Sequence, residues 1–166
     1  MIRVALIEDD ADIRDNLMLI IDRAEGFSCR QAFSDVQEAG KSLLNDPPDV
    51  LLMDITLPGK MNGIEGVEFL RAAGATFETI MLTVHQEEKL VFDALCAGAC
   101  GYLTKNTPPN RILDALREAG SLGALLDSID PALDAHGAAR AKLEGFAAEL
   151  HRLGILTTAR AISLTN

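Results

Sequence analysis

The sequence predicts an α/β protein, a doubly wound parallel sheet of five strands with helices on both faces. Two observations lead to this expectation. Five short apolar runs alternate with stretches of helical character over about the first 120 residues, and such alternation is typical of successive βα units. Polar residues follow four of these runs directly, at the ends where parallel strands share one edge of a sheet.

Each expected strand is a short run rich in apolar residues. The first is expected at Ile2–Ile7, and a weaker one at Phe27–Phe33. Val50–Met53 is apolar, which favours a central strand buried on both faces. The last two strands are expected at Thr79–Leu82 and Gly101–Leu103.

The expected helices follow the strands and are bounded by residues that commonly start or end helices. The first has an apolar face and stops near Gly26, as glycine often ends a helix. The second is capped by Ser34 or Asp35 and ends before Pro47, because these residue types favour those places. The remaining helices are expected at about Ile64–Ala73, Glu87–Ala97 and Pro109–Ala119.

A composition break at Gly120–Gly123 divides the chain into a sheet domain, 1–120, and a C-terminal extension, 121–166, that we expect to be helical. The first part holds 20 acidic and 11 basic side chains, and the second holds 5 and 4. Neither part has the basic face that binding to a phosphate backbone requires. We therefore expect no direct contact with nucleic acid.

Hydropathy and cysteine usage predict a cytoplasmic protein. The longest apolar runs are far shorter than the roughly 18 residues of a membrane span, and the start lacks the apolar region of a signal peptide. Cys29, Cys96 and Cys100 are an odd number of cysteines with no secretory signal ahead of them, which indicates reduced thiols. We expect them to serve as small buried apolar residues.

Three successive acids, Glu8, Asp9 and Asp10, follow the first expected strand. Crowded carboxylates repel one another unless a cation or solvent relieves the charge, and Mg²⁺ prefers such oxygen ligands. Acids at the start of a helix also complement its dipole, so these residues alone leave both interpretations open. If the strand ends at Ile7, then Glu8 and Asp9 lie over the sheet edge and Asp10 begins the helix.

Asp54, Thr83 and Lys105 follow three further strands and would meet the acids at the same edge. The end of a buried strand is a costly place for a charge, and a carboxylate there can act as a phosphoryl nucleophile. A hydroxyl and an ammonium can bind phosphoryl oxygens. Each residue alone could instead cap a turn or be solvated, so the combination carries the prediction. We expect the ammonium of Lys105 at the surface edge rather than in the core.

Residues 1–120 resemble the receiver domain of bacterial response regulators, the CheY-like domain of two-component systems. The matching positions are the acidic pair Glu8 and Asp9, the phosphoacceptor Asp54, the switch hydroxyl Thr83, the lysine Lys105, and Tyr102, which matches the aromatic residue that moves inward on activation. The run from Ala97 to Lys105 is similar to the NarL/LuxR-type subfamily, which usually carries a helix-turn-helix domain. Residues 121–166 are too few for such a domain.

This resemblance implies a flavodoxin-like fold with strand order 2-1-3-4-5. It implies that Asp54 accepts a phosphoryl group from a histidine kinase or histidine phosphotransfer protein, and that the output is protein–protein contact. It also implies Mg²⁺ bound by Glu8, Asp9, Asp54 and the backbone carbonyl of Thr56. The chain would then be no enzyme beyond the self-catalysed phosphorylation and dephosphorylation of Asp54.

Two rival functions remain from the residues. The chain could be the N-terminal part of a DNA-binding transcriptional regulator whose effector domain is truncated or absent. A phosphatase with an aspartyl nucleophile would carry a second Asp two residues later, where Thr56 stands.

The family pattern also places a glycine eight residues after the phosphoacceptor, whereas Gly63 is nine after Asp54, so we expect a loop one residue longer. Val84 is bulkier than the small residue common after the switch hydroxyl.

The C-terminal extension carries an apolar stripe with heptad-like spacing, formed by Ala139, Leu143, Phe146, Leu150 and Leu153. The stripe could pack against the sheet domain, form the seam of a homodimer, or bind another partner. We expect Leu143, Phe146 and Leu150 to be buried in one of the first two ways, because an exposed apolar stripe favours association.

Overall fold

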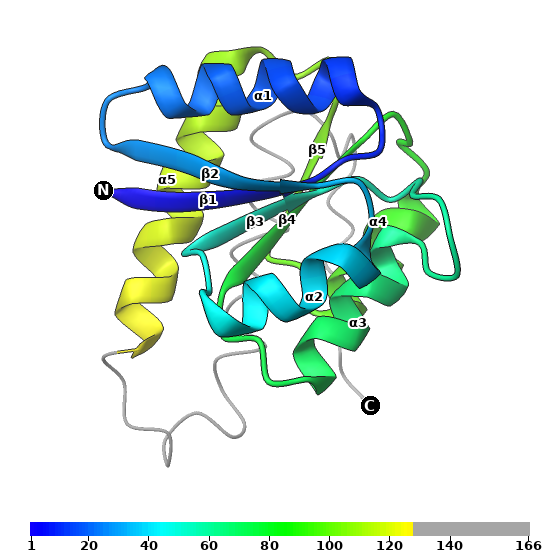
Figure 1. Ribbon diagram of the computed structural model, residues 1–166. Helices are drawn as coiled ribbons and strands as arrows, with labels where there is room; N and C mark the ends of the chain where they lie inside the picture. Colours follow the sequence, from blue (N-terminus) through cyan, green and yellow to red (C-terminus); the bar gives the residue numbers. More distant parts are fainter. Residues whose placement is uncertain (128–166) are drawn as a thin grey trace, which may run out of the picture. The chain divides into compact units, whose positions relative to one another are not determined.

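The computed structural model describes residues 1–127 (Figure 1), so the apolar stripe and its homodimer seam lie outside the described residues. The strands are β1 Ile2–Ile7, β2 Phe27–Phe33, β3 Val50–Met53, β4 Glu78–Thr83 and β5 Gly101–Thr104. The helices are α1 Ala11–Arg23, α2 Val36–Asn45, α3 Gly63–Ala72, α4 Glu88–Ala97 and α5 Pro109–Asp127. Every strand and helix expected within these residues is present.

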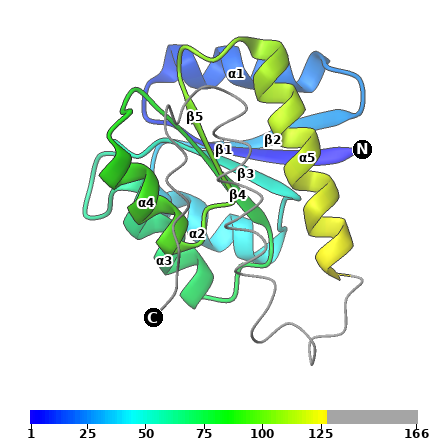
Figure 2. The same cartoon turned by 180° about the vertical axis from the view of Figure 1, so that it is seen from behind.

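The five strands form one parallel sheet in the order β2-β1-β3-β4-β5, which confirms the expected topology. Helices α1 and α5 cover one face, and α2, α3 and α4 cover the other (Figures 1 and 2). The central strands are the most buried: all residues of β3 and β4 and the last four of β1 are buried. Such burial on both faces matches the apolar sequence of β3 and of the last four residues of β1, whereas β4 also buries Glu78, Thr79 and Thr83.

Helix α5 differs from the sequence-based expectation. It continues through Gly120 and Gly123 to Asp127, so the expected end at Ala119 was wrong. Glycine inside a helix costs only about 1 kcal/mol relative to alanine, and Gly120 has a packing role. A Cβ atom at Gly120 would lie 3.0 Å from the side chain of Ile2. The missing side chain therefore allows α5 to lie close to β1.

Side-chain caps fix where most helices begin. The carboxylate of Asp10 accepts hydrogen bonds from the backbone of Asp12 and Ile13, and Asp35 caps α2 in the same way. Asn62 and Glu65 form a capping box at the start of α3. Helix α4 differs from these three, because its N-cap residue, Glu87, makes no capping hydrogen bond through its side chain.

A buried ion pair lies at the opposite edge of the sheet from the strand ends that carry the acids. Glu78, the first residue of β4, is 2 % exposed, and its carboxylate lies 3.7 Å from the guanidinium of Arg71. The same guanidinium donates hydrogen bonds of 3.3 Å to the carbonyls of Ala75 and Gly98. Arg71 therefore ties α3 to the start of β4 and to the end of α4.

The cysteines only partly follow the expectation of burial. Cys29 is buried in β2, Cys100 is half-buried, and Cys96 is exposed on α4. Cys96 lies on the solvent side of a helix whose buried positions are Val91, Ala94 and Ala97, so the helical period places it outward. Among residues 1–127, no helix is both long and apolar enough to cross a membrane.

Candidate functional site

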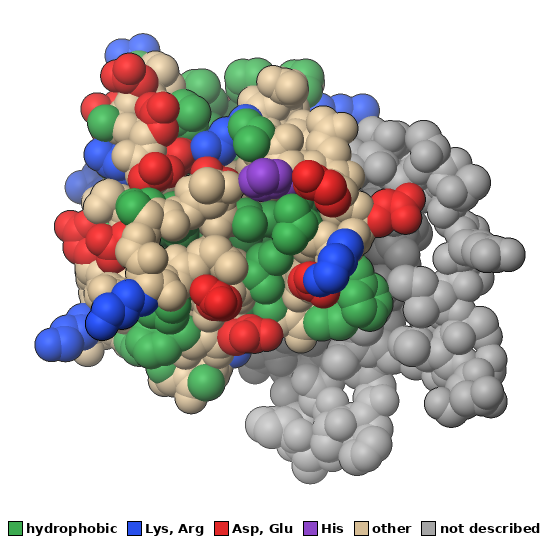
Figure 3. Space-filling model, turned by 90° about the vertical axis from the view of Figure 1, so that its right-hand side faces the viewer, with side chains coloured by type: hydrophobic (Ala, Val, Ile, Leu, Met, Phe, Trp, Pro, Cys, Tyr) green, Lys and Arg blue, Asp and Glu red, His purple; other side chains and the backbone are tan. Residues whose placement is uncertain are grey.

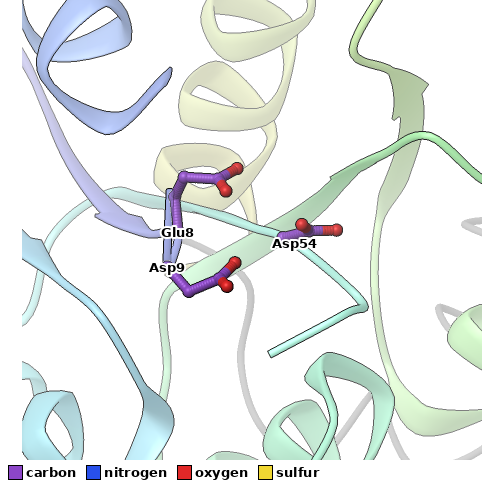
Figure 4. Close-up of side chains that lie close together, drawn as sticks. All are labelled: Glu8, Asp9 and Asp54. Carbon is purple, nitrogen blue, oxygen red and sulfur yellow. The ribbon is translucent and has the colours of Figure 1, made fainter. Parts of the chain in front are cut away.

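The three acidic side chains at the sheet edge lie together (Figure 4). Ile7 and Met53 are paired in the register of β1 and β3, so the residues that follow them, Glu8 and Asp54, are neighbours. The Asp54 N–H donates a 3.0 Å hydrogen bond to the Ile7 carbonyl. One carboxylate oxygen from each of Glu8, Asp9 and Asp54 lies within 4.8 Å of the others. The sheet thus brings together acids that are 45 residues apart in the chain.

The burial of these acids is unequal. Glu8 and Asp54 are 3 % and 4 % exposed, whereas Asp9 is exposed. Burial of an uncompensated carboxylate is costly, so the two inner acids need a cation. The outer acid remains reachable from solvent, which gives the cluster an open side.

Lys105 supplies the cation. Its ammonium lies 2.8 Å from Glu8 and 2.7 Å from Asp54, and its side chain is only 15 % exposed. The expectation that the ammonium lies at the surface edge rather than in the core holds in part: Lys105 is half-buried at the sheet edge, where two buried carboxylates draw its ammonium inward. The backbone N–H of Lys105 donates a 2.9 Å hydrogen bond to the Thr83 carbonyl. This bond fixes the backbone position from which the lysine side chain extends.

The buried charges shift the pKa values of Glu8 and Lys105. Burial raises the pKa of Glu8, and the charge of Asp54 adds to this effect, against the lowering influence of Lys105. Burial alone would lower the pKa of Lys105, but its hydrogen bonds and charge interactions with Asp54 and Glu8 outweigh this and raise it. Three carboxylates around one ammonium leave an excess of negative charge, as suits a divalent cation with oxygen ligands.

Thr83 and Tyr102 occupy the positions expected from the sequence. Thr83 ends β4 and is fully buried, and its hydroxyl accepts a long hydrogen bond of 3.4 Å from the His85 N–H. Tyr102 in β5 is 1 % exposed, and its hydroxyl donates a 3.1 Å hydrogen bond to the His85 carbonyl. Burial raises the pKa of Tyr102 to about 12, with smaller contributions from the charges of Glu87 and Asp54.

His85 is a residue of this region that the sequence-based reasoning missed. Its Nε2 lies 2.9 Å from the hydroxyl oxygen of Thr56, and the Thr56 N–H donates a 3.2 Å hydrogen bond to Asp54. The available signal was its place two residues after Thr83, in a loop at the same edge of the sheet. Figure 3 shows this side of the molecule, where exposed hydrophobic side chains are flanked by acidic ones.

Gly63 allows the loop after Asp54 to return close to the end of β3. A Cβ atom at this position would collide with the carbonyl group of Asp54 and with the Cα atom of Ile55. The Gly63 N–H donates a 2.8 Å hydrogen bond to the Ile55 carbonyl. The glycine nine residues after Asp54 therefore packs directly on it, while Gly59, with a φ of 100°, turns the intervening loop.

Comparisons with known proteins agree with this geometry. Residues 4–117 match the family model for the response regulator receiver domain. Response regulator UvrY of Escherichia coli (strain K12) is 33 % identical over 121 residues, which are 73 % of this chain and 55 % of UvrY. The uncharacterized transcriptional regulatory protein YxjL of Bacillus subtilis (strain 168) is 31 % identical over 149 residues, 90 % of this chain and 68 % of YxjL.

A crystal structure of a LuxR-family two-component response regulator from Aurantimonas sp. SI85-9A1 is also similar. Its TM-score is 0.69 at 29 % sequence identity, over 73 % of this chain and 86 % of that one. The match to UvrY covers little more than half the length of that relative. The family match spans well over half of the present chain, and the chain therefore belongs to the response regulator receiver family, with LuxR-type regulators among its relatives.

Proposed function

We propose that this chain accepts a phosphoryl group on Asp54 from a histidine kinase or histidine phosphotransfer protein, and that it signals through protein–protein contacts in the cytoplasm. The observation that supports this most directly is the placement of Asp54. Its carboxylate is 4 % exposed, pairs with Lys105 at 2.7 Å, and shares an oxygen cluster with Glu8 and Asp9. A buried acid with this surrounding is arranged for nucleophilic chemistry rather than for solvation.

In the proposed reaction, a carboxylate oxygen of Asp54 attacks phosphorus and the bond from phosphorus to the donor's histidine nitrogen breaks. The donor imidazole keeps the electron pair of that bond. Lys105 then pairs with an oxygen of the transferred group, and the Thr83 hydroxyl donates a hydrogen bond to another. Such positioned charges are the main source of catalysis in phosphoryl transfer. The protein turns over no other substrate, since the acceptor is its own residue.

The donor set fits Mg²⁺. Glu8, Asp9 and Asp54 provide carboxylate oxygens within 4.8 Å of one another, and we assign the backbone carbonyl of Thr56 as a further ligand. When bound, Mg²⁺ would offset the negative charge that the cluster presents to an incoming phosphoryl group. The transferred group would then favour the arrangement in which Tyr102 lies inward, as it does in this structure at 1 % exposure, and this arrangement would be the switch that partners recognise.

Phosphorylation in solution tests the acceptor. Wild type and Asp54→Asn are incubated with acetyl phosphate and Mg²⁺, and the intact mass is recorded. Wild type should gain one phosphoryl group, and Asp54→Asn should gain none. The exposed acid Asp15 of α1 provides the matched control, because Asp15→Asn should be phosphorylated as wild type is. Stoichiometric phosphate on Asp54→Asn would refute the assignment.

One observation favours a second function, in which the chain is part of a DNA-binding transcriptional regulator. The match to YxjL covers 149 of the 166 residues, so it extends beyond the receiver match that ends at residue 117. The low basic content of residues 121–166 weighs against direct DNA binding. Gel-shift titrations with random-sequence duplex DNA at low salt, with and without beryllofluoride, test whether this chain itself contacts DNA, and a salt-sensitive shift would support the second function.

A further inference from the structure

His85 contacts three separate parts of the site. Its imidazole Nε2 lies 2.9 Å from the Thr56 hydroxyl, in the loop that follows Asp54. Its carbonyl accepts the hydrogen bond from Tyr102 at 3.1 Å. Its imidazole Nδ1 lies 3.5 Å from the carboxylate of Glu87, the N-cap residue of α4.

These contacts form a continuous path from Asp54 to Tyr102. The Thr56 N–H donates to Asp54, the Thr56 hydroxyl shares a hydrogen bond with His85, and His85 accepts from Tyr102. The alternative path runs through Thr83, whose hydroxyl lies 3.4 Å from the His85 N–H. Hydrogen bonds between N–H and oxygen usually measure about 2.7–3.2 Å, so the path through Thr56 is the closer one.

The loop that carries His85 has little else to hold its side chains. Val84 is 67 % exposed, and Gln86 and Glu87 are exposed as well. Helix α4, which follows, begins without a side-chain cap. The imidazole is therefore the side chain through which this loop is anchored to the loop after Asp54.

We propose that His85 is a positioning residue, whose imidazole ties the loop after Asp54 to the loop after Thr83 and so holds in place the carbonyl that keeps Tyr102 buried. The path would connect Asp54 to Tyr102 without passing through the Thr83 hydroxyl. Its role in signalling rests on the proposed phosphorylation of Asp54. Its role in holding Tyr102 does not, because that role is argued from contacts among the chain's own residues.

Tyr102 provides a clean reporter, since the chain contains one tyrosine and no tryptophan. In the wild type, ionisation of the phenol, followed by absorbance at 295 nm, should have a midpoint near the pKa of about 12. His85→Ala should move the midpoint toward the usual value of about 10 and increase quenching of tyrosine fluorescence by acrylamide. His85→Gln, which retains a polar group at similar reach, should restore part of the shift. Gln86→Ala, in the same loop, should change nothing.

A pair of double variants separates positioning from general loosening of the loop. Thr56→Val removes the partner hydroxyl, so Thr56→Val combined with His85→Ala should shift the Tyr102 midpoint no further than either single change. Thr83→Ala acts on the other path, so its effect should add to that of His85→Ala. A Tyr102 midpoint that stays near 12 in His85→Ala, or full additivity between Thr56→Val and His85→Ala, would overturn the inference.

The experiment is independent of the test of the proposed function. Tyr102 is measured without any phosphodonor, whereas phosphorylation is read from intact mass. In a second arm, beryllofluoride is added with Mg²⁺, and His85→Ala should lose most of the change in tyrosine fluorescence that wild type shows. If His85→Ala retains the full change, the path through His85 is not the coupling, even though Asp54 accepts phosphate.

Discussion

Replacement of Lys105 should destabilise the fold, and Lys105→Met isolates the charge because methionine keeps most of the apolar stem. Glu8 and Asp54, both at most 4 % exposed, would then face each other without their ammonium. Removing one partner of a buried ion pair costs about 3–5 kcal/mol. Lys105 retains some solvent contact, so we expect the lower end, about 3 kcal/mol. At roughly 2–4 °C per kcal/mol, the unfolding midpoint should fall by about 6–12 °C.

The pH dependence of this loss has a definite sign. The pKa of Glu8 is already raised above its usual 4.5 by burial, and loss of the ammonium should raise it further. The folded variant therefore binds a proton more readily than the unfolded chain. Its stability should rise as pH falls from 7 through that raised pKa toward 4.5, which narrows the difference from wild type. At pH values above the raised pKa of Glu8, the full loss of stability in Lys105→Met should persist.

Thermal unfolding by circular dichroism, at several pH values and with or without Mg²⁺, measures these effects. Lys89 is the matched control, because its ammonium pairs with Asp93 at 2.6 Å while its side chain is 83 % exposed. Exposed pairs contribute about 0–1 kcal/mol, so Lys89→Met should barely move the midpoint. Mg²⁺ should stabilise Lys105→Met more than wild type, since it replaces the missing charge. Equal midpoints for the two variants at pH 7 would refute this account of the site.

Two further predictions concern packing and thiol reactivity. Gly63→Ala should destabilise the fold by about 3 kcal/mol, the upper end for overpacking, because its Cβ would meet backbone atoms. Gly59→Ala has open space around the new Cβ. It should destabilise the fold by only about 1–2 kcal/mol, the cost of a left-handed conformation for a residue with a Cβ. Denaturant unfolding compares them, and a larger loss at Gly59 would contradict the assigned contact. A thiol reagent should modify the exposed Cys96 rapidly and Cys29 only on unfolding. Burial, with a smaller contribution from the charge of Asp22, raises the pKa of Cys29 to about 12. Mass spectrometry should show that Cys96→Ser lacks the fast phase of modification.

The strand ends were predictable because apolar runs and topology together determine them. Met53 is the last residue of β3 and Asp54 follows it, as the sequence suggested. Since all the strands are parallel, residues after them converge whatever their distance along the chain. The convergence of Glu8, Asp54 and Lys105 therefore followed from secondary structure alone.

Side-chain reach and burial were not predictable in this way. The ammonium of Lys105 turns inward because it pairs with the buried carboxylates of Glu8 and Asp54. The sequence around Lys105 gives no information on how deeply these carboxylates are buried. His85 was missed because its partner, Thr56, is 29 residues away on another loop. Helix α5 continues past Gly120, where the absence of a side chain allows close approach to Ile2, at the other end of the described chain. In each case the contact is with a residue far away in the sequence. The spacing of apolar residues gives information only about neighbours within the same helix or strand.

The two ends of α4 differ in their hydrogen bonds. At the C-terminal end, Arg71 donates a hydrogen bond to the Gly98 carbonyl, and the Gly98 N–H donates hydrogen bonds to the carbonyls of Ala94 and Leu95. The first turn lacks a side-chain cap, an interaction that usually contributes about 1 kcal/mol. The last turn of α4 is therefore held by more hydrogen bonds than the first. We expect a displacement of the loop before α4 to move its first turn more than its last.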